Sequence, residues 1–288
     1  MLRVEFRAMG TDVELLLDAP PDASAERAFE AVRAEFERLE AILSRFRPDS
    51  ELSELNRAGR LCASPDLLRV TELALEARER TGGRFDPTVH DALVAAGYDR
   101  SFEELGAGGM VVATPPRTRC GGAVTISPPT GEIALGIGVR LDFGGIGKGY
   151  AVDRACDLLA PHGPCLVSAG GDLAVRGGAW PVGVETDGET ITLELTSGAI
   201  ATSGSDRRRW STPAGEAHHL IDPRSGVPAE TDLLRVTVVG RTTVEAEVLA
   251  KSLYLAGAEA GRAEADELGF PAVLVPLDGP AIVAGGLA

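Results

Sequence analysis

The stretch LDFGGIGKGYAVD, residues 141–153, joins a predicted strand to a predicted helix through a turn of glycines. Upstream of it, apolar residues alternate with small or polar ones from Ile133 to Phe143, which is the period of a half-buried strand. The helix is predicted to begin near Lys148 and to end at about Pro161. A strand, a glycine turn and a helix start in this order predict a place where backbone N–H groups hold an anion.

Lys148 is one of only two lysines in the chain, and the other is Lys251. The surrounding glycines leave the backbone open to an approaching phosphate, and Lys148 adds a mobile positive charge. The stretch is not a Walker P-loop, because Gly149 stands where a Ser or Thr would hold magnesium, and it does not match GxGxxG. A flexible turn with a solvated lysine is the alternative. The rarity of lysine favours a functional role for Lys148.

The segments around this stretch predict an α+β fold with mixed or antiparallel sheets backed by helices. Residues 2–18 are expected to form a pair of strands, and apolar residues between Phe29 and Phe46 recur at spacings of three and four, as in a helix. A second helix is predicted between Ser64-Pro65 and Gly82-Gly83. Further predictions are strands within 165–177, 180–185, 191–195 and 232–240, a polar loop over 202–210, and a capped helix over 242–257. No repeat or linker is evident, so one globular domain over 1–288 is expected.

The composition excludes several classes of protein. A net charge of −15 opposes binding to a phosphate backbone, so no nucleic-acid partner is expected. No apolar run approaches the roughly 20 residues that cross a bilayer, and the amino terminus lacks the pattern of a secretory signal. The four cysteines have no CxxC spacing, which favours free thiols over a metal site or disulfides. We therefore expect a cytoplasmic protein without membrane insertion.

Eight stretches, taken together and in order, resemble one family, the ApbE-type FAD:protein FMN transferases. The resemblance covers nearly the whole chain, and it implies an ApbE-like, T-fold-related α+β flavin-binding fold. The stretches are MGT at 9–11, SRFRPDSELSELN at 44–56, GGRFDPTV at 82–89, LDFGGIGKGYAVD, LVSAGGDLAVRG at 166–177, ATSGSDRRRW at 201–210, HLIDPRSGVP at 219–228 and the helix over 242–257.

The resemblance implies an enzyme that moves FMN from FAD onto a Thr or Ser hydroxyl of another protein and releases AMP. By matching position, Met9 and Phe46 would flank the rings of FAD, and Asp142 and Lys148 would line the nucleotide. Other implied cofactor contacts are Arg84, Phe85, Asp86 and Ile221. His219 and Asp222 would lie near the reacting phosphate, where a base must accept a proton from the acceptor hydroxyl.

The resemblance also implies a magnesium ion, at which this sequence departs from the family. The matching positions are the backbone carbonyl of Gly145 and the side chains of Glu247 and Lys251, where the family usually has Asp and Thr. Glu247 can still offer oxygen to magnesium, whereas a protonated Lys251 has no lone pair to donate. The two side chains share a helix face, so an exposed ion pair is the simplest interpretation. The sharper hypothesis is that Lys251 replaces part of the cation's charge.

Three functions fit these observations. The first is covalent flavinylation of an acceptor protein, and the second is a flavin carrier that holds FAD without turnover. The third is an FAD pyrophosphatase that gives free FMN and AMP. Of the other histidines, His162 follows a predicted helix end, which favours a structural role, whereas the pattern does not assign roles to His90 and His218.

Overall fold

The computed structural model describes residues 1–105, 120–186, 188–213 and 215–287. Contacts divide the chain into two compact units. The first comprises Met1–Arg38, Ile146–Gly204 and Thr231–Ala288, and the second comprises Leu39–Gly145 and Ser205–Glu230. Each unit is assembled from separate stretches, so neither is a continuous piece of sequence. The single domain expected over 1–288 stays a prediction, which one cooperative unfolding transition would support.

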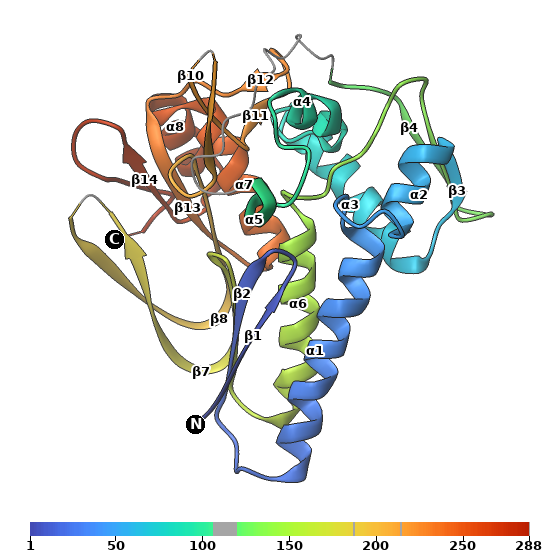
Figure 1. Cartoon of the computed structure of the whole chain (residues 1–288). Helices are drawn as coiled ribbons and strands as arrows, with labels where there is room; N and C mark the ends of the chain where they lie inside the picture. Colours follow the sequence, from blue (N-terminus) through green and yellow to red (C-terminus); the bar gives the residue numbers. More distant parts are fainter. Residues whose placement is uncertain (106–119, 187, 214, 288) are drawn as a thin grey trace. The chain divides into compact units, whose positions relative to one another are not determined.

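The first unit contains an eight-stranded sheet in which every neighbouring pair of strands is antiparallel (Figure 1). The order across the sheet is β1-β2-β6-β7-β8-β13-β14-β15. The strands are β1 (Leu2–Ala8), β2 (Thr11–Leu17), β6 (Cys165–Ala169), β7 (Asp172–Glu185), β8 (Thr190–Gly204), β13 (Leu233–Gly240), β14 (Ala272–Pro276) and β15 (Ile282–Ala284). The predicted α+β class is confirmed, with antiparallel pairing throughout this sheet.

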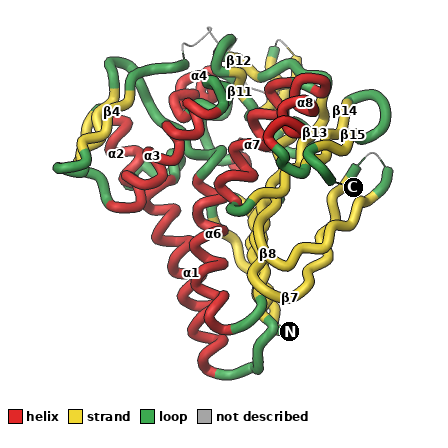
Figure 2. The backbone as a smooth tube through the Cα atoms, turned by 180° about the vertical axis from the view of Figure 1, so that it is seen from behind, coloured by secondary structure: helices red, strands yellow, loops and turns green. Residues whose placement is uncertain are grey.

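Helices pack against this sheet. Helix α6 (Gly147–Leu159) contacts β6 and β7, and α7 (Thr243–Ala256) contacts β8, β13 and α6. Helix α1 (Ala23–Leu43) begins in the first unit and lies beside α6 in Figures 1 and 2, where Arg154 pairs with Glu35 at 3.2 Å. The remaining helices of this unit are η2 (Ala160–His162) and α8 (Ala258–Leu268). Burial of the shared apolar faces stabilises the arrangement.

Two tight hairpin turns lie at one end of the sheet. Met9 and Gly10 connect β1 to β2 with φ values of 51° and 67°, the left-handed conformation that a two-residue hairpin turn requires. Gly170 and Gly171 connect β6 to β7 with φ values of 62° and 101°. A Cβ on Gly170 would lie 2.4 Å from Oγ1 of Thr11, so the two turns are neighbours.

The second unit contains short helices and three small sheets. The helices are α2 (Glu51–Ala58), α3 (Pro65–Arg80), η1 (Pro87–Val89), α4 (His90–Ala95) and α5 (Phe102–Leu105). One sheet has the order β3-β5-β4, and the other two are the pairs β9 with β10 and β11 with β12. Their strands are β3 (Arg60–Cys62), β4 (Val124–Ser127), β5 (Glu132–Leu135), β9 (Arg209–Thr212), β10 (Gly215–His218), β11 (Ile221–Asp222) and β12 (Val227–Pro228).

The strand predicted from Ile133 to Phe143 is wrong beyond Leu135, where β5 ends. Gly136 to Val139 form a turn closed by a hydrogen bond from the amide of Val139 to the carbonyl of Gly136, and Ile137 at its tip is fully exposed. Downstream, the Asn56 side chain donates to the Leu141 carbonyl at 2.8 Å and accepts from its amide at 2.7 Å. A side chain therefore satisfies the backbone where the alternation predicted a sheet neighbour.

Other predicted elements are confirmed with adjusted ends. The strand pair within 2–18 is present, and Ser64 caps α3 by accepting a hydrogen bond from the amide of Leu67. Thr242 caps the start of α7, and the helix ends at Ala256 with Gly257, the predicted stop residue, as its C-cap. The polar loop expected over 202–210 is wrong at both ends, because β8 continues to Gly204 and β9 begins at Arg209.

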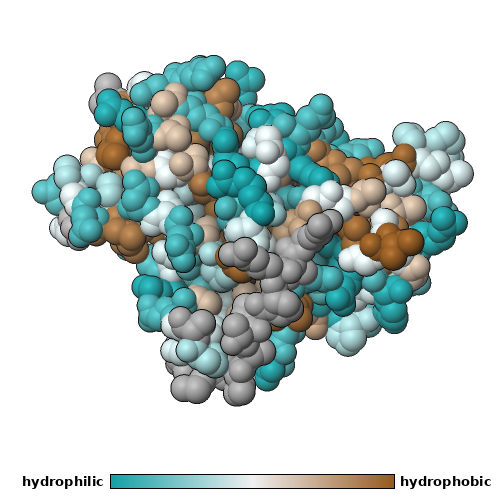
Figure 3. Space-filling model, turned by 90° about the horizontal axis from the view of Figure 1, so that it is seen from above, coloured by the Kyte–Doolittle hydropathy of each residue, from teal (hydrophilic) through white to brown (hydrophobic). Residues whose placement is uncertain are grey.

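On the face of the molecule drawn in Figure 3, hydrophilic residues are widespread and the apolar residues lie in separate areas among them. Within the part of the chain that the structure describes, no helix has both the length and the apolar character of a bilayer span.

Candidate functional site

Lys148 lies in the first turn of α6, where it binds two buried carboxylates. Its Nζ donates to Oε1 of Glu247 at 2.9 Å and to Oδ2 of Asp172. The side chains of Lys148, Asp172 and Glu247 are 14%, 3% and 5% exposed. Buried charges require this kind of pairing, because an isolated ion loses its hydration without compensation. The ammonium is therefore held in one position by elements far apart in the sequence.

Glu247 also binds the backbone at the start of α6. Its Oε2 accepts a hydrogen bond from the amide of Gly149 at 2.9 Å. A Cβ on Gly149 would lie 2.8 Å from that oxygen and 3.0 Å from the backbone of Thr243, so only glycine permits this approach of α6 to α7. The sequence predicted open amides ready for an external anion. At Gly149 that prediction is wrong, because the amide already donates to the carboxylate of Glu247 and is not open to an external anion.

A second carboxylate joins the same two helices. Asp153 on α6 accepts hydrogen bonds from the amides of Thr243 at 2.8 Å and Val244 at 3.1 Å, which are otherwise unpaired groups at the start of α7. Burial raises the pKa of the Asp153 carboxyl, and the two backbone hydrogen bonds partly oppose that shift. The start of α7, and with it the position of Glu247, is thus fixed from α6.

Lys251 lies one turn beyond Glu247 on α7 and is half-buried. Residues four apart share a helix face, so the two lysines of the chain come to the surroundings of one carboxylate. The exposed ion pair considered for Glu247 and Lys251 is wrong in one respect, since Glu247 is only 4% exposed. Lys148, Asp172, Glu247 and Lys251 are called the lysine–carboxylate cluster below.

The lysine–carboxylate cluster does not fit a resident magnesium ion. Both oxygens of Glu247 are already bound, one by the ammonium of Lys148 and one by an amide. Lys251 has no lone pair while protonated. Among the residues that the structure describes, no group of three or more His, Cys, Asp or Glu side chains has the arrangement of a metal site.

Met9 stands at the same end of the large sheet as Asp172. Its hairpin turn neighbours the Gly170-Gly171 turn, and Asp172 is the first residue of β7 after that turn. Met9 has the positive φ value of 51°, which an L-residue adopts at some cost. The backbone therefore presents the Met9 side chain from a strained turn, a feature common at binding sites.

In the second unit, Arg45 and Asp142 form a buried ion pair. Nε of Arg45 lies 2.6 Å from Oδ2 of Asp142, and their side chains are 5% and 8% exposed. Oδ1 of Asp142 accepts a hydrogen bond from the amide of Gly144 at 2.8 Å. Arg45 further donates to the carbonyl of Tyr98 at 2.7 Å. Both oxygens of Asp142 are thus bound within the unit.

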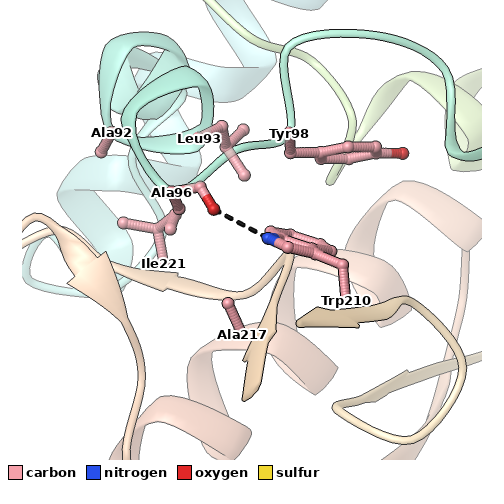
Figure 4. Packing of buried hydrophobic residues seen from close by; sticks show 7 residues of the cluster. All are labelled: Ala92, Leu93, Ala96, Tyr98, Trp210, Ala217 and Ile221. Atoms are coloured by element: carbon pink, nitrogen blue, oxygen red, sulfur yellow. Dashed lines mark hydrogen bonds between the residues drawn. The ribbon is translucent and has the colours of Figure 1, made fainter. Parts of the chain in front are cut away.

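Arg45 also contacts aromatic rings of the second unit. Its guanidinium carbon lies 4.1 Å from the centroid of the Phe46 ring and 4.7 Å from that of the Tyr98 ring, a cation–π arrangement. The ring of Tyr98 stacks on Trp210 with centroids 5.4 Å apart, and Nε1 of Trp210 donates to the carbonyl of Ala96 at 2.8 Å (Figure 4). Ile221 belongs to the same buried cluster, whereas Phe46 at its edge is 39% exposed. Arg45, Asp142, Phe46, Tyr98 and Trp210 are called the arginine–aromatic cluster.

The predicted segment 84–86 lies at the entry to η1. Asp86 caps this turn by accepting hydrogen bonds from the amide and the hydroxyl of Thr88. Phe85 is 3% exposed, and Arg84 is half-buried. The amide of Asp142 donates to the carbonyl of Pro87 at 2.8 Å. The structure thereby brings Asp86 and Asp142 into one neighbourhood, although 56 positions separate them in the sequence.

The two candidate bases differ in their partners. Asp222 accepts three hydrogen bonds from Arg224, one from its amide and two from its guanidinium. His219 follows β10, is half-buried and has its Nδ1 in the buried part. His218 has a structural arrangement, since its Nε2 pairs with the carbonyl of Ala229 and its Nδ1 accepts from the amide of Leu220. Burial lowers the pKa of His218.

Sequence reasoning missed Asp172, Asp153 and Arg45. Asp172 directly follows the two glycines of GGDLAVRG, and an acidic residue after such a turn is a usable signal. Asp153 ends the stretch LDFGGIGKGYAVD, five positions after Lys148. Arg45 stands beside Phe46, but as one of many arginines it carried no signal of its own.

The fold defines an α+β class that solved structures share. The chain superposes on the ApbE protein of Thermotoga maritima with a TM-score of 0.86 and 24% identity, covering 98% of this chain and 96% of that chain. The apo form of the flavinyl transferase ApbE from Pseudomonas stutzeri gives a TM-score of 0.83 at 24% identity, covering 98% and 94%.

Sequence comparison then identifies the family. The ApbE family model matches residues 9–274, and the chain belongs to this family. An FAD:protein FMN transferase of Treponema pallidum is 29% identical over 275 residues, which is 83% of this chain and 74% of that protein. One from Klebsiella pneumoniae is 25% identical over 295 residues, which is 96% of this chain and 84% of that protein.

Proposed function

We propose that this protein is a transferase that moves FMN from FAD onto a Thr or Ser hydroxyl of an acceptor protein and releases AMP. The observation that carries the proposal is the family match over residues 9–274, which includes the lysine–carboxylate cluster. Relatives that span most of the chain are named FAD:protein FMN transferase. FAD is then the donor substrate, and the acceptor protein is the second substrate.

In the proposed reaction, the acceptor oxygen attacks the FMN phosphorus of FAD. A new phosphorus–oxygen bond forms, the pyrophosphate bond to AMP breaks, and the hydroxyl proton passes to a base. Such transfer depends mainly on positioning and on positive charge near the phosphate oxygens. Lys148 is the proposed source of that charge, since Asp172 and Glu247 hold its ammonium in place.

His219 is the proposed base. Asp222 was the alternative, but both oxygens of its carboxylate already accept hydrogen bonds from Arg224, three in all, so this side chain is engaged within its own turn. A neutral imidazole accepts a proton near neutral pH, where an ordinary His is largely uncharged. Asp222 is instead proposed to position its turn and the guanidinium of Arg224.

The cofactor-binding residues receive different proposed roles according to their exposure. Phe46 offers a partly exposed ring, and Met9 an apolar side chain at a hairpin tip, so both are proposed to contact the rings of FAD. Arg84 is proposed to contact FAD with its guanidinium. The buried residues are proposed to shape the backbone around the cofactor; they are Phe85, Asp86, Asp142 and Ile221.

Magnesium is not part of this proposal, because the lysine–carboxylate cluster does not fit it, although the resemblance implies a site at Gly145, Glu247 and Lys251. A cytoplasmic location is proposed because the four cysteines are not paired in disulfides. Cys62, Cys120, Cys156 and Cys165 are all free thiols, as expected in a reducing compartment.

The test is an incubation of the purified protein with FAD, with and without an acceptor protein that carries the Thr or Ser. Transfer gives AMP and a heavier, covalently yellow acceptor, detected by intact mass and in-gel fluorescence. Free FMN with AMP would instead indicate a pyrophosphatase, and unchanged bound FAD a carrier. An acceptor with Ala in place of its Thr or Ser is the matched control, and label on that variant would refute the proposed linkage.

A further inference from the structure

The lysine–carboxylate cluster is electrically balanced by its own side chains. Asp172 and Glu247 contribute two negative charges, and Lys148 and Lys251 contribute two positive charges. Lys148 contacts both carboxylates directly, and Lys251 shares the helix face of Glu247. A divalent cation added to this group would bring charge that no side chain of the cluster compensates.

We infer that the ammonium of Lys148, fixed between Asp172 and Glu247, does in this protein the electrostatic work of a divalent cation, so that the flavin-free protein does not hold magnesium. The statement about metal binding depends only on the contacts within the lysine–carboxylate cluster. The expected effect of metal on FMN transfer rests, in addition, on the proposed function.

Geometry opposes a cation at Glu247. Magnesium takes octahedral oxygen ligands at about 2.1 Å and gives up its water reluctantly. An ion bound to Oε1 of Glu247 would share that oxygen with the ammonium of Lys148, whose Nζ lies 2.9 Å from it, and two cations so close repel strongly. An ion bound to Oε2 would share that oxygen with the amide of Gly149, whose nitrogen lies 2.9 Å away.

Two residues of α7 set this arrangement. The length of Glu247 allows one oxygen to reach Lys148 while the other reaches Gly149. An Asp at this position is one methylene shorter and cannot span both partners without movement of the helices. A Thr in place of Lys251 would remove one positive charge and supply a hydroxyl oxygen. Glu247→Asp with Lys251→Thr therefore leaves one uncompensated negative charge and two side chains that can donate oxygen to a metal.

The decisive experiment measures metal binding without flavin. Mn²⁺ serves as a paramagnetic probe for Mg²⁺ and is titrated into flavin-free protein while free Mn²⁺ is followed by electron paramagnetic resonance. We expect no saturable binding by the natural protein within the titrated range. The Glu247→Asp/Lys251→Thr variant should bind Mn²⁺ with a Kd at least about tenfold below the highest concentration at which the natural protein shows none. Glu259→Asp/Arg262→Thr, which changes exposed residues of α8, is the matched control and should behave like the natural protein.

One stoichiometric Mn²⁺ bound by the natural protein and lost in Glu247→Gln would overturn the inference. So would equal affinities of the natural protein and the double variant, provided that circular dichroism shows both to be folded. These outcomes do not depend on flavin chemistry. A failure of the proposed transferase function is thus distinguishable from a failure of the metal inference.

A second measurement tests the consequence for transfer. FMN transfer is assayed with EDTA in excess and again with added Mg²⁺. We expect the natural protein to keep most of its rate in EDTA, and the double variant to depend steeply on Mg²⁺. Complete loss of transfer by the natural protein in EDTA, with recovery on Mg²⁺ addition, would also overturn the inference.

Discussion

The lysine–carboxylate cluster of the first unit and the arginine–aromatic cluster of the second each centre on a largely buried cation, Lys148 in one and Arg45 in the other. Lys148 is surrounded by two carboxylates, whereas Arg45 has one carboxylate, one carbonyl and two aromatic faces. An ammonium is a compact point charge, while a guanidinium is planar, donates in fixed directions and stacks on rings. The two clusters show that the surroundings, more than the charge, decide between Lys and Arg.

The two clusters also differ in expected role, with Lys148 acting in the reaction and Arg45 in the local fold. Lys148 is partly accessible at the start of a helix, and its partners come from β7 and α7. Arg45 joins the segment after α1 to Tyr98, which belongs to a buried hydrophobic cluster of the second unit. We therefore expect changes at Lys148 to affect transfer directly, and changes at Arg45 to act through the local fold.

The largest effect is expected for Lys148→Met. It leaves Asp172 and Glu247 buried without their shared cation, at a cost of about 4–5 kcal/mol in the free energy of unfolding. Transfer should be lost as well. Urea unfolding measures the first effect and the FMN transfer assay the second.

The matched control for this change is Lys148→Met/Glu247→Gln. Because it removes one uncompensated charge, it should regain part of the stability and none of the transfer. Equal stabilities for Lys148→Met and the natural protein would show that the two carboxylates need no cation. The contrast between the two clusters could then not be explained by the pairing of charges around Lys148.

A smaller effect is expected for Arg45→Met, which leaves only Asp142 without its partner. The free energy of unfolding should fall by about 3 kcal/mol. Arg45→Lys keeps the charge but loses the hydrogen bond to Tyr98 and the stacking on Phe46, and it should cost about 1–2 kcal/mol. Urea unfolding with Trp fluorescence reports this region, since Trp210 stacks on Tyr98. If Arg45→Lys were as damaging as Arg45→Met, charge would matter less here than shape.

The smallest effect is expected for His218, which has a structural role. Burial lowers the pKa of its imidazole below the ordinary value of 6.5. Its stabilising contribution is complete above pH 6.5 and is lost as pH falls toward the lower folded-state pKa, because the unfolded chain binds the proton first. His218→Gln should flatten this loss, by at most about 1.4 kcal/mol for each pH unit. Urea midpoints measured on both sides of pH 6.5 test it, and an unchanged slope would contradict it.

Much of the fold followed from local patterns. The strand pair within 2–18, the capped helix α3 and the helix α7 are local in origin, since alternation, caps and stop residues act over a few positions. The prediction of a strand as far as Phe143 is wrong because apolar and polar residues go on alternating beyond Leu135, where the backbone turns. Asn56, 85 positions from Leu141, satisfies that backbone instead, and no local pattern encodes such a partner.

The candidate site divides in the same way. The sequence singled out Lys148 by its rarity and Glu247 by its match to the family, but it did not connect the two residues. It expected the start of α6 to await an external anion, whereas the chain places Glu247 against Gly149. Asp172 received no role, although it follows a turn of two glycines.

The sequence by itself determined which segments form helices and strands, which glycines permit tight turns, and to which family the protein belongs. Only the tertiary structure decided that Lys148, Asp172 and Glu247 share one buried place. Side chains 24 and 99 positions apart meet because the sheet and its helices bury apolar surface together. Once buried, opposite charges must pair, and that requirement selects partners by distance in space, whatever their separation along the chain.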